Sequence, residues 1–171
     1  MMGCVGRVSV TTNIWGAKWA KLINSSMVLG PLGILGLKPW EVAGEPGVFE
    51  LCIRLGRETT AVGTALGYTI EAIFGLGAEE FTGSTEEVLE KNLRTIAGVV
   101  GKHGRGVVIQ DYLKGRCSEV DYLNGLVVKK GRQAHVPTPA NEAIVQIDRQ
   151  IQLGALKPDR SNLALVETMI R

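Results

Sequence analysis

The sequence is poor in cysteine and histidine and has no surplus of one charge, and each shortage excludes a class of protein. It has 3 widely spaced cysteines and 2 histidines, so it offers neither a disulfide framework nor the clustered ligands of a zinc site. The 171 residues carry a formal net charge of +2, with basic residues mixed among acidic ones, which leaves no electrostatic footprint for nucleic acid. We therefore expect free thiols, no metal and no nucleic-acid partner.

Long apolar runs are also missing. The most apolar segment, Met27 to Leu37, contains glycines and a proline. A membrane-spanning helix needs about 20 residues, and this segment is much shorter. The first residues lack the basic region and apolar core of a signal peptide. The hydrophobic content of 45% and charged content of 21% are typical of a globular domain. The composition predicts a soluble, cytoplasmic protein without a membrane segment.

Glycine and proline divide the chain into about seven segments with helical periodicity. Pro46 suits a first helical turn, and Ser84 can form a capping box with Glu87. Pro31 falls inside the first apolar segment, which starts near Trp15, so we expect a broken or kinked helix there. The predicted helices cover about residues 15–29, 46–62, 84–101, 106–114, 119–132, 139–153 and 158–170.

A strand pattern occurs only near residues 8–13. The predicted fold class is therefore all-α, with residues 1–13 as a linker or remnant strand and residues 14–171 as a helical domain. The glycine pairs Gly75/Gly77 and Gly104/Gly106 follow no strand and lack the third glycine of a dinucleotide-binding fingerprint. We predict no cofactor-binding residue in this chain.

Three polar residues share one face of the first helix. Lys21, Asn24 and Ser25 stand at positions i, i+3 and i+4. A lysine on a largely apolar helix would be partly buried, a setting that favours proton transfer near neutral pH. The alternative is a surface lysine whose methylenes cover apolar neighbours.

Two acidic residues, Glu119 and Asp121, stand at the expected start of the 119–132 helix. There they would be favoured by the helix macrodipole, or one of them would bind substrate hydroxyls or orient the lysine. Asn124-Gly125 falls within the same segment, where glycine costs about 1 kcal/mol relative to alanine. A close helix–helix contact is the simplest reason for a glycine at that place.

These motifs together resemble a known family. Lys21-Leu-Ile-Asn24, then Ser118-Glu-Val-Asp-Tyr-Leu-Asn-Gly125, then Val136-Pro-Thr-Pro-Ala-Asn141 follow the order seen in the C-terminal domain of the ketopantoate reductase (2-dehydropantoate 2-reductase) family. The resemblance implies a helical domain similar to that of 6-phosphogluconate dehydrogenase relatives, without the Rossmann domain that binds NADP. It also implies an oxidoreductase of pantothenate biosynthesis and a homodimer.

The same resemblance implies roles for individual residues. By motif position Lys21 corresponds to the general acid and Glu119 to the residue that grips the substrate, while Asn24 and Ser25 would bind substrate or position the lysine. Two polar positions of the family correspond here to Leu29 and Val107. Because sites built for hydrogen bonds discriminate strongly, these two losses favour a different or lost substrate.

The sequence therefore predicts the substrate-binding and proton-transfer half of an NADP-dependent 2-keto acid reductase that needs a Rossmann partner. The chain would be a fragment of a longer reductase, a separate subunit or a domain relic. The alternative is a non-catalytic helical dimerisation or interaction domain built on its apolar helix faces. A third possibility, a cofactor-free lysine enzyme that forms a Schiff base, has no specific motif behind it.

Overall fold

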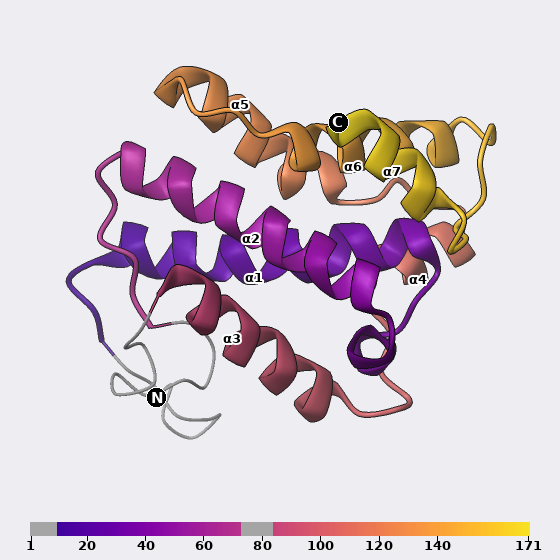
Figure 1. The fold of residues 1–171 in the computed structure, drawn as a ribbon, viewed down its shortest axis with the longest axis horizontal. Coiled ribbons are helices and arrows are strands. Elements are labelled where there is room, and N and C mark those ends of the chain that lie inside the picture. Colours follow the sequence, from indigo (N-terminus) through magenta and orange to yellow (C-terminus); the bar gives the residue numbers. More distant parts are fainter. Residues whose placement is uncertain (1–9, 73–83) are drawn as a thin grey trace.

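A computed structural model describes residues 10–72 and 84–171. Within these ranges every regular element is helical and no strand occurs, which confirms the predicted all-α class with about seven α-helices (Figure 1). Residues 10–13 form no strand, and residues 8 and 9 of that prediction, like Gly75 and Gly77, lie outside the described ranges. The elements are α1 (Ile14–Leu35), η2 (Pro39–Gly44), α2 (Pro46–Ala65), α3 (Thr85–Val100), α4 (Val107–Leu113), η4 (Val120–Tyr122), α5 (Asn124–Ala134), α6 (Pro139–Gln152) and α7 (Asn162–Ile170), where η denotes a 3₁₀-helix.

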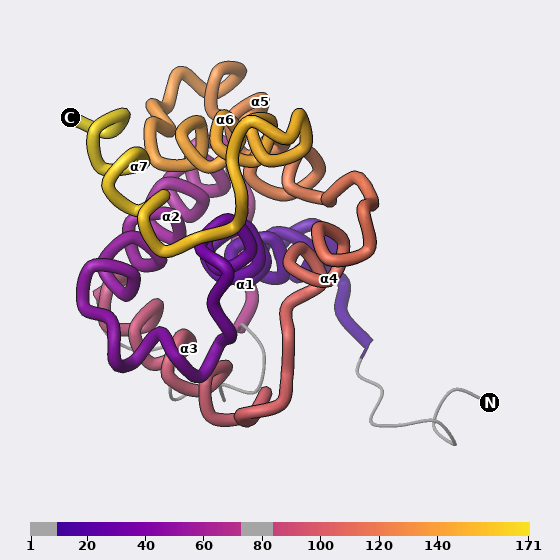
Figure 2. Tube along the Cα trace, turned by 90° about the vertical axis from the view of Figure 1, so that its right-hand side faces the viewer, coloured from indigo at the N-terminus to yellow at the C-terminus, as the bar shows by residue number. Residues whose placement is uncertain are grey.

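Helix α1 is the axis of the molecule. It lies beside α2, with α3 on one side and the group α5, α6 and α7 on the other, and α4 packs across it (Figures 1 and 2). Between Trp19 and Leu35 the only exposed residue is Lys21, and Leu29 is half-buried. A helix that is apolar nearly all round belongs in the centre of a domain, which is where α1 lies.

Of the predicted broken or kinked helix at Pro31, the break is wrong. Helix α1 continues through Pro31 and ends at Gly36, whose φ of 68° is left-handed. The Gly36 N–H donates to the Gly33 carbonyl, and the Leu37 N–H donates to the Leu32 carbonyl, which closes the last turn. Neighbours on all sides of α1 outweigh the local cost of an internal proline, about 3 kcal/mol.

Most of the predicted helix starts agree with the structure to within about one residue, and those at 119 and 158 are wrong. Pro46 opens α2, and the Ser84 Oγ accepts from the Glu87 N–H as the capping box requires. The expected 119–132 helix is instead the short η4 followed by α5, so Glu119 precedes a 3₁₀ turn and does not stand in the first turn of an α-helix. Helix α7 begins after residue 161, because the Asp159 side chain first accepts a hydrogen bond from the Ser161 N–H.

A buried amide joins α1, α5 and α6. The Asn124 Nδ2 donates to the Ser26 carbonyl and to the Asn141 Oδ1, both at 2.9 Å. The close approach that the sequence suggested at Gly125 is made at Gly30, where an added Cβ would lie 2.3 Å from the Asn124 Oδ1. The Asn-Gly pair therefore reflects helix packing through its asparagine.

None of the helices in the described ranges has both the length and the apolar run needed to cross a membrane.

Candidate functional site

Lys21 lies on the wall of an open depression of about 470 Å³. The depression is bounded by the first turns of α1, by Tyr68 just after α2 and by the start of α5. These segments lie toward the left of Figure 1, where α1 begins and α2 ends. The residue that carries the sequence-based prediction of chemistry is thus placed at a concave surface, and not on a convex face of the domain.

Lys21 is exposed, so the expectation that it is partly buried is wrong for the described chain. It shares a stripe of α1 with Lys18 and Ser25, which also line the depression. The Lys18 ammonium lies 4.9 Å from the centre of the Trp15 ring, close enough for a cation–π interaction. The first turns of α1 therefore present two ammonium groups and one hydroxyl side by side.

Asn24 does not join this stripe. It is buried, and its Oδ1 accepts a hydrogen bond from Asn92 of α3. At 3.6 residues per turn, a residue three positions after Lys21 lies about 60° to one side of it, and a residue four positions after lies about 40° to the other. The structure thus brings Lys21 and Ser25 together and turns Asn24 into the contact between α1 and α3.

Glu119 is half-buried beside η4 and does not line the depression as the described residues define it. Leu123, four residues further on, does line it. The roles that the resemblance gives to Lys21, Asn24, Ser25 and Glu119 stay predictions. Of these four residues, Lys21 and Ser25 lie together on the wall of the depression.

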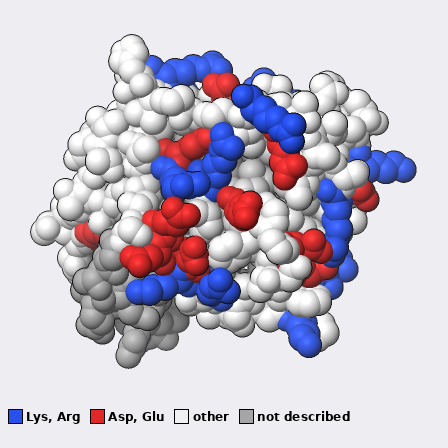
Figure 3. Space-filling view, viewed as in Figure 1, with Lys and Arg blue, Asp and Glu red and all other residues white. Residues whose placement is uncertain are grey.

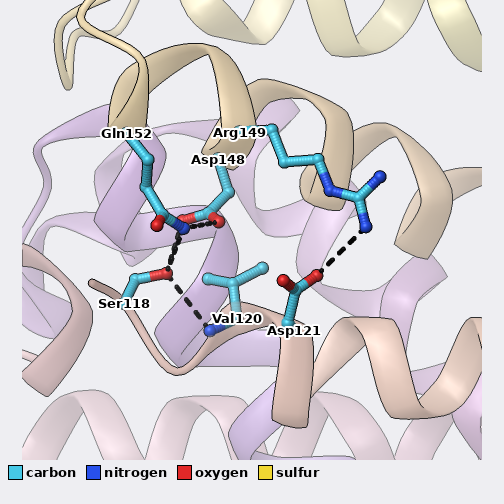
Figure 4. Close-up of polar contacts among 6 residues, drawn as sticks. All are labelled: Ser118, Val120, Asp121, Asp148, Arg149 and Gln152. Atoms are coloured by element: carbon cyan, nitrogen blue, oxygen red, sulfur yellow. Dashed lines mark hydrogen bonds and ion pairs between the residues drawn. The ribbon is translucent and has the colours of Figure 1, made fainter.

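A hydrogen-bond cluster that the sequence analysis missed fixes the segment before Glu119. Asp148 of α6 is fully buried. Its carboxylate accepts from the Tyr112 hydroxyl, from the Ser118 hydroxyl and from the Gln152 amide, each at 2.5 Å. The Ser118 oxygen also accepts from the Val120 N–H at 3.3 Å, so the cluster holds the turn that leads into η4 (Figure 4).

The cluster has an electrostatic consequence for Tyr112. Burial, together with the hydrogen bond to Asp148, raises the pKa of the Tyr112 hydroxyl well above its ordinary value of 10.0. A phenol that donates to a buried carboxylate is stabilised in its neutral form. The exposed pair Asp121 and Arg149, 3.4 Å apart, flanks the same turn (Figure 4). No sequence motif identified Asp148, because two of its three partners, Tyr112 and Ser118, stand 36 and 30 residues away in the sequence.

The aromatic floor of the depression is rigidly held. The Trp19 indole N–H donates to the Thr59 carbonyl at 2.9 Å, and its ring lies 5.1 Å from that of Tyr68. Gly63 of α2 makes room for it, because an added Cβ would lie 2.1 Å from the indole nitrogen. No sequence motif indicated Tyr68 as part of this floor, because its partner Trp19 stands on α1, in a different part of the chain.

A larger depression, of about 640 Å³, lies between α2, α3 and α7. Its lining mixes both charges, including the pair Arg57 and Glu86 at 3.4 Å. Acidic and basic side chains are likewise interspersed across the face of the molecule in Figure 3. The depression at Lys21 differs, since the charged residues of its lining that the structure describes are all lysines.

The described residues do not fit a dinucleotide. A nucleotide-binding unit needs a strand, a glycine-rich turn and a helix whose amino terminus faces the pyrophosphate, and the described ranges contain no strand. In the same ranges no three His, Cys, Asp or Glu side chains come together as a metal site.

Comparison with known proteins agrees with this architecture. A sequence profile described as ketopantoate reductase PanE/ApbA C terminal matches residues 13–152. A 2-dehydropantoate 2-reductase of Archaeoglobus fulgidus is 24% identical over 136 residues, which are 80% of this chain and 40% of that protein. A PanE/ApbA family ketopantoate reductase of Ralstonia eutropha JMP134 aligns with a TM-score of 0.71 and 26% identity over 87% of this chain and 45% of that structure.

A dimeric ketopantoate reductase of Staphylococcus aureus aligns over 87% of this chain and 47% of that structure, with a TM-score of 0.66 and 18% identity. The chain thus spans less than half the length of these relatives. Its fold defines it as an all-helical domain of the kind found in ketopantoate reductases. The profile match covers most of the chain, so the chain belongs to the ketopantoate reductase C-terminal domain family.

Proposed function

We propose that this domain is the substrate-binding and proton-transfer part of a 2-keto acid reductase that resembles 2-dehydropantoate 2-reductase. The observation that carries the proposal is the placement of Lys21. It is exposed in an otherwise buried length of α1, and it opens onto a depression with Ser25 beside it. Membership of the family supports the assignment.

The domain's share of the reaction is the proton. When the keto carbon gains a hydride, the C=O π bond breaks and its electron pair moves to the oxygen. The Lys21 ammonium then donates one proton to this oxygen and is left as a neutral amine, which regains a proton from solvent. Ser25 is placed to bind the substrate next to Lys21, and Glu119 is proposed to hold a substrate hydroxyl. Asn24 acts indirectly, because its contact with Asn92 holds the turn that carries Lys21.

The hydride donor requires a separate unit. Since the described residues do not fit a dinucleotide, we assign NADP to a Rossmann domain outside them. Residues 14–171 would form the helical domain, with residues 1–13 as the connection to that unit. The dimeric relative from Staphylococcus aureus supports a homodimer as the working assembly.

Substitution of Lys21 tests the proposal in the reductase assembled with its nucleotide-binding domain. Lys21→Ala should lower the turnover number by about 10²–10⁴-fold, the usual contribution of a positioned general acid. Lys129→Ala is the matched control, since Lys129 is an exposed lysine that does not line the depression. Unchanged turnover in Lys21→Ala and Glu119→Ala would reject the proposal and favour the non-catalytic interaction domain.

A further inference from the structure

The depression at Lys21 combines a cationic rim with an apolar floor. We infer that it takes 2-keto acids with an aromatic or large apolar side chain, in preference to the hydroxylated ketopantoate. This inference rests on the proposed function, since it names the substrate class of that site. Three properties of the described lining carry it: its charge, its apolar surface and the small number of neutral groups that can bind a hydroxyl.

The charge of the lining selects an anion. Lys18 and Lys21 of α1 face the depression together with Lys130 of α5, and none of its lining residues within the described ranges carries a carboxylate. Lys18 is held over the Trp15 ring at 4.9 Å, and the Lys130 ammonium donates to Gln133 at 3.1 Å. Because the three ammonium groups come from two helices, a substrate carboxylate and the oxygen that becomes an alkoxide can each face a cation.

The apolar surface selects the rest of the ligand. Trp15 is 62% exposed at the mouth, while Trp19 and Tyr68 form a fixed aromatic pair on the floor. Leu22, Leu123 and Leu126 complete the wall from α1 and from the start of α5. Exposed aromatic and aliphatic surface at a concave site gains free energy when an apolar ligand covers it.

Few groups remain to bind a hydroxylated side chain. Among the described lining residues, the neutral hydrogen-bonding groups of the side chains are the hydroxyls of Ser25 and Tyr68 and the indole N–H groups of Trp15 and Trp19. The Trp19 N–H is already bonded to Thr59, and Asn24 is turned into the core. A ligand hydroxyl pressed against the leucines would lose its water without a new partner, which costs affinity. Glu119, outside the lining, remains for the hydroxyl formed at the reacting carbon.

The test compares three probes on this chain: phenylpyruvate, ketopantoate and phenylacetate, which lacks the keto group. Calorimetry should give a dissociation constant for phenylpyruvate at least roughly tenfold below that for ketopantoate, as burial of one aromatic ring predicts. Phenylacetate should bind more weakly than phenylpyruvate. In ¹H–¹⁵N spectra the indole signals of Trp15 and Trp19 should shift, whereas Trp40, in η2 beyond the far end of α1, should not.

Two variants and their controls locate the effect, with circular dichroism to verify folding. Leu126→Asn should reduce the preference for phenylpyruvate. Leu165→Asn should leave the preference unchanged, because Leu165 is an exposed leucine on α7 and does not line the depression. Lys130→Gln should weaken both keto acids to a similar extent, and Lys129→Gln should weaken neither.

The outcomes separate the inference from the function beneath it. Ketopantoate binding as tightly as phenylpyruvate, or more tightly, would overturn the inference and leave the keto acid reductase standing. Equal binding of phenylacetate and phenylpyruvate, or no binding of either keto acid at millimolar concentration, would overturn the proposed function with it. Phenylpyruvate binding that leaves the Trp15 and Trp19 signals unshifted would reject this depression as the site.

Discussion

At the scale of single residues, Lys21 owes its position to its neighbours. The residues around it on α1 are buried, and its own side chain leaves the helix toward the depression. The hypothesis that Lys21 transfers a proton placed it in a partly buried setting, whereas the structure leaves it exposed. In the proposed reaction, a general acid at such an open surface would depend on the proposed partner unit, or on the substrate itself, to exclude water.

Tyr112 gives a residue-scale prediction about pH. Its folded-state pKa is raised above the ordinary 10.0, mainly by burial. The unfolded chain therefore loses this proton first as pH rises, and the stability that the neutral phenol contributes is present below pH 10 and lost above it. Above pH 10 the free energy of unfolding of Tyr112→Phe should fall less steeply than that of the wild type, by about 1.4 kcal/mol per pH unit.

Urea unfolding between pH 7 and pH 11 measures this difference. At pH 7 Tyr112→Phe should be less stable by about 1–2 kcal/mol, because the buried Asp148 carboxylate loses one donor. Tyr122→Phe, at a side chain that is 80% exposed, should change the stability by less than about 0.5 kcal/mol. Parallel slopes for the wild type and Tyr112→Phe would contradict the assigned cause.

At the scale of elements, the start of α6 is capped by a residue from another helix. Thr138 precedes α6 but makes no capping bond with its side chain. The carboxylate of Glu58, on α2, accepts instead from the Ala140 N–H at 2.9 Å and from the Asn141 N–H at 3.0 Å. A carboxylate at a helix amino terminus is also stabilised by the positive end of the macrodipole. The bond between the two helices thereby fixes α6, which carries Asp148.

Substitution of Glu58 should therefore destabilise the fold. Glu58→Ala leaves two N–H groups and the Asn141 amide without this acceptor, and we expect a loss of about 1–3 kcal/mol in the free energy of unfolding by urea. Glu50→Ala, an exposed acid on the same helix, is the control and should change little. A Glu58→Ala protein as stable as the control would show that the cap contributes nothing.

At the scale of the whole molecule, the stability of the domain depends on one hydrophobic core, which is built around α1. Cys52 of α2 lies in this core with no exposed surface, and burial raises the pKa of its thiol to about 12. Cys117 is exposed. Since the thiolate is the reactive form, the two thiols should differ strongly in reactivity.

Labelling with a thiol reagent at pH 8, followed by peptide mass spectrometry, tests the integrity of this core. Cys117 should react within minutes, and Cys52 should react at the rate of opening of the core, at least about 10³-fold more slowly under native conditions. Urea near the unfolding midpoint should remove the difference. Equal labelling of Cys52 and Cys117 in buffer would contradict a stable core around α1.

Local features of the sequence were sufficient for the helical class and for several helix boundaries. Helical periodicity, Pro46 at the start of α2 and the Ser84–Glu87 box act between residues within a turn of one another, so they can be read from the sequence. The motif around Lys21 likewise identified a lysine that the structure places at a depression.

The tertiary structure decided what local rules leave open. Helix α1 continues through Pro31 because surrounding helices compensate for the missing hydrogen bond. Asn24 faces the core, where it accepts a hydrogen bond from Asn92. The two residues stand 68 positions apart in the sequence, so no local pattern could show this contact. The Asp148 cluster and the aromatic floor at Tyr68 also join distant segments. The sequence by itself determined the helical class and most of the helix starts, and its motif singled out Lys21, since these features depend on neighbours along the chain. Only the packing of the helices decided which side chains share a surface with Lys21.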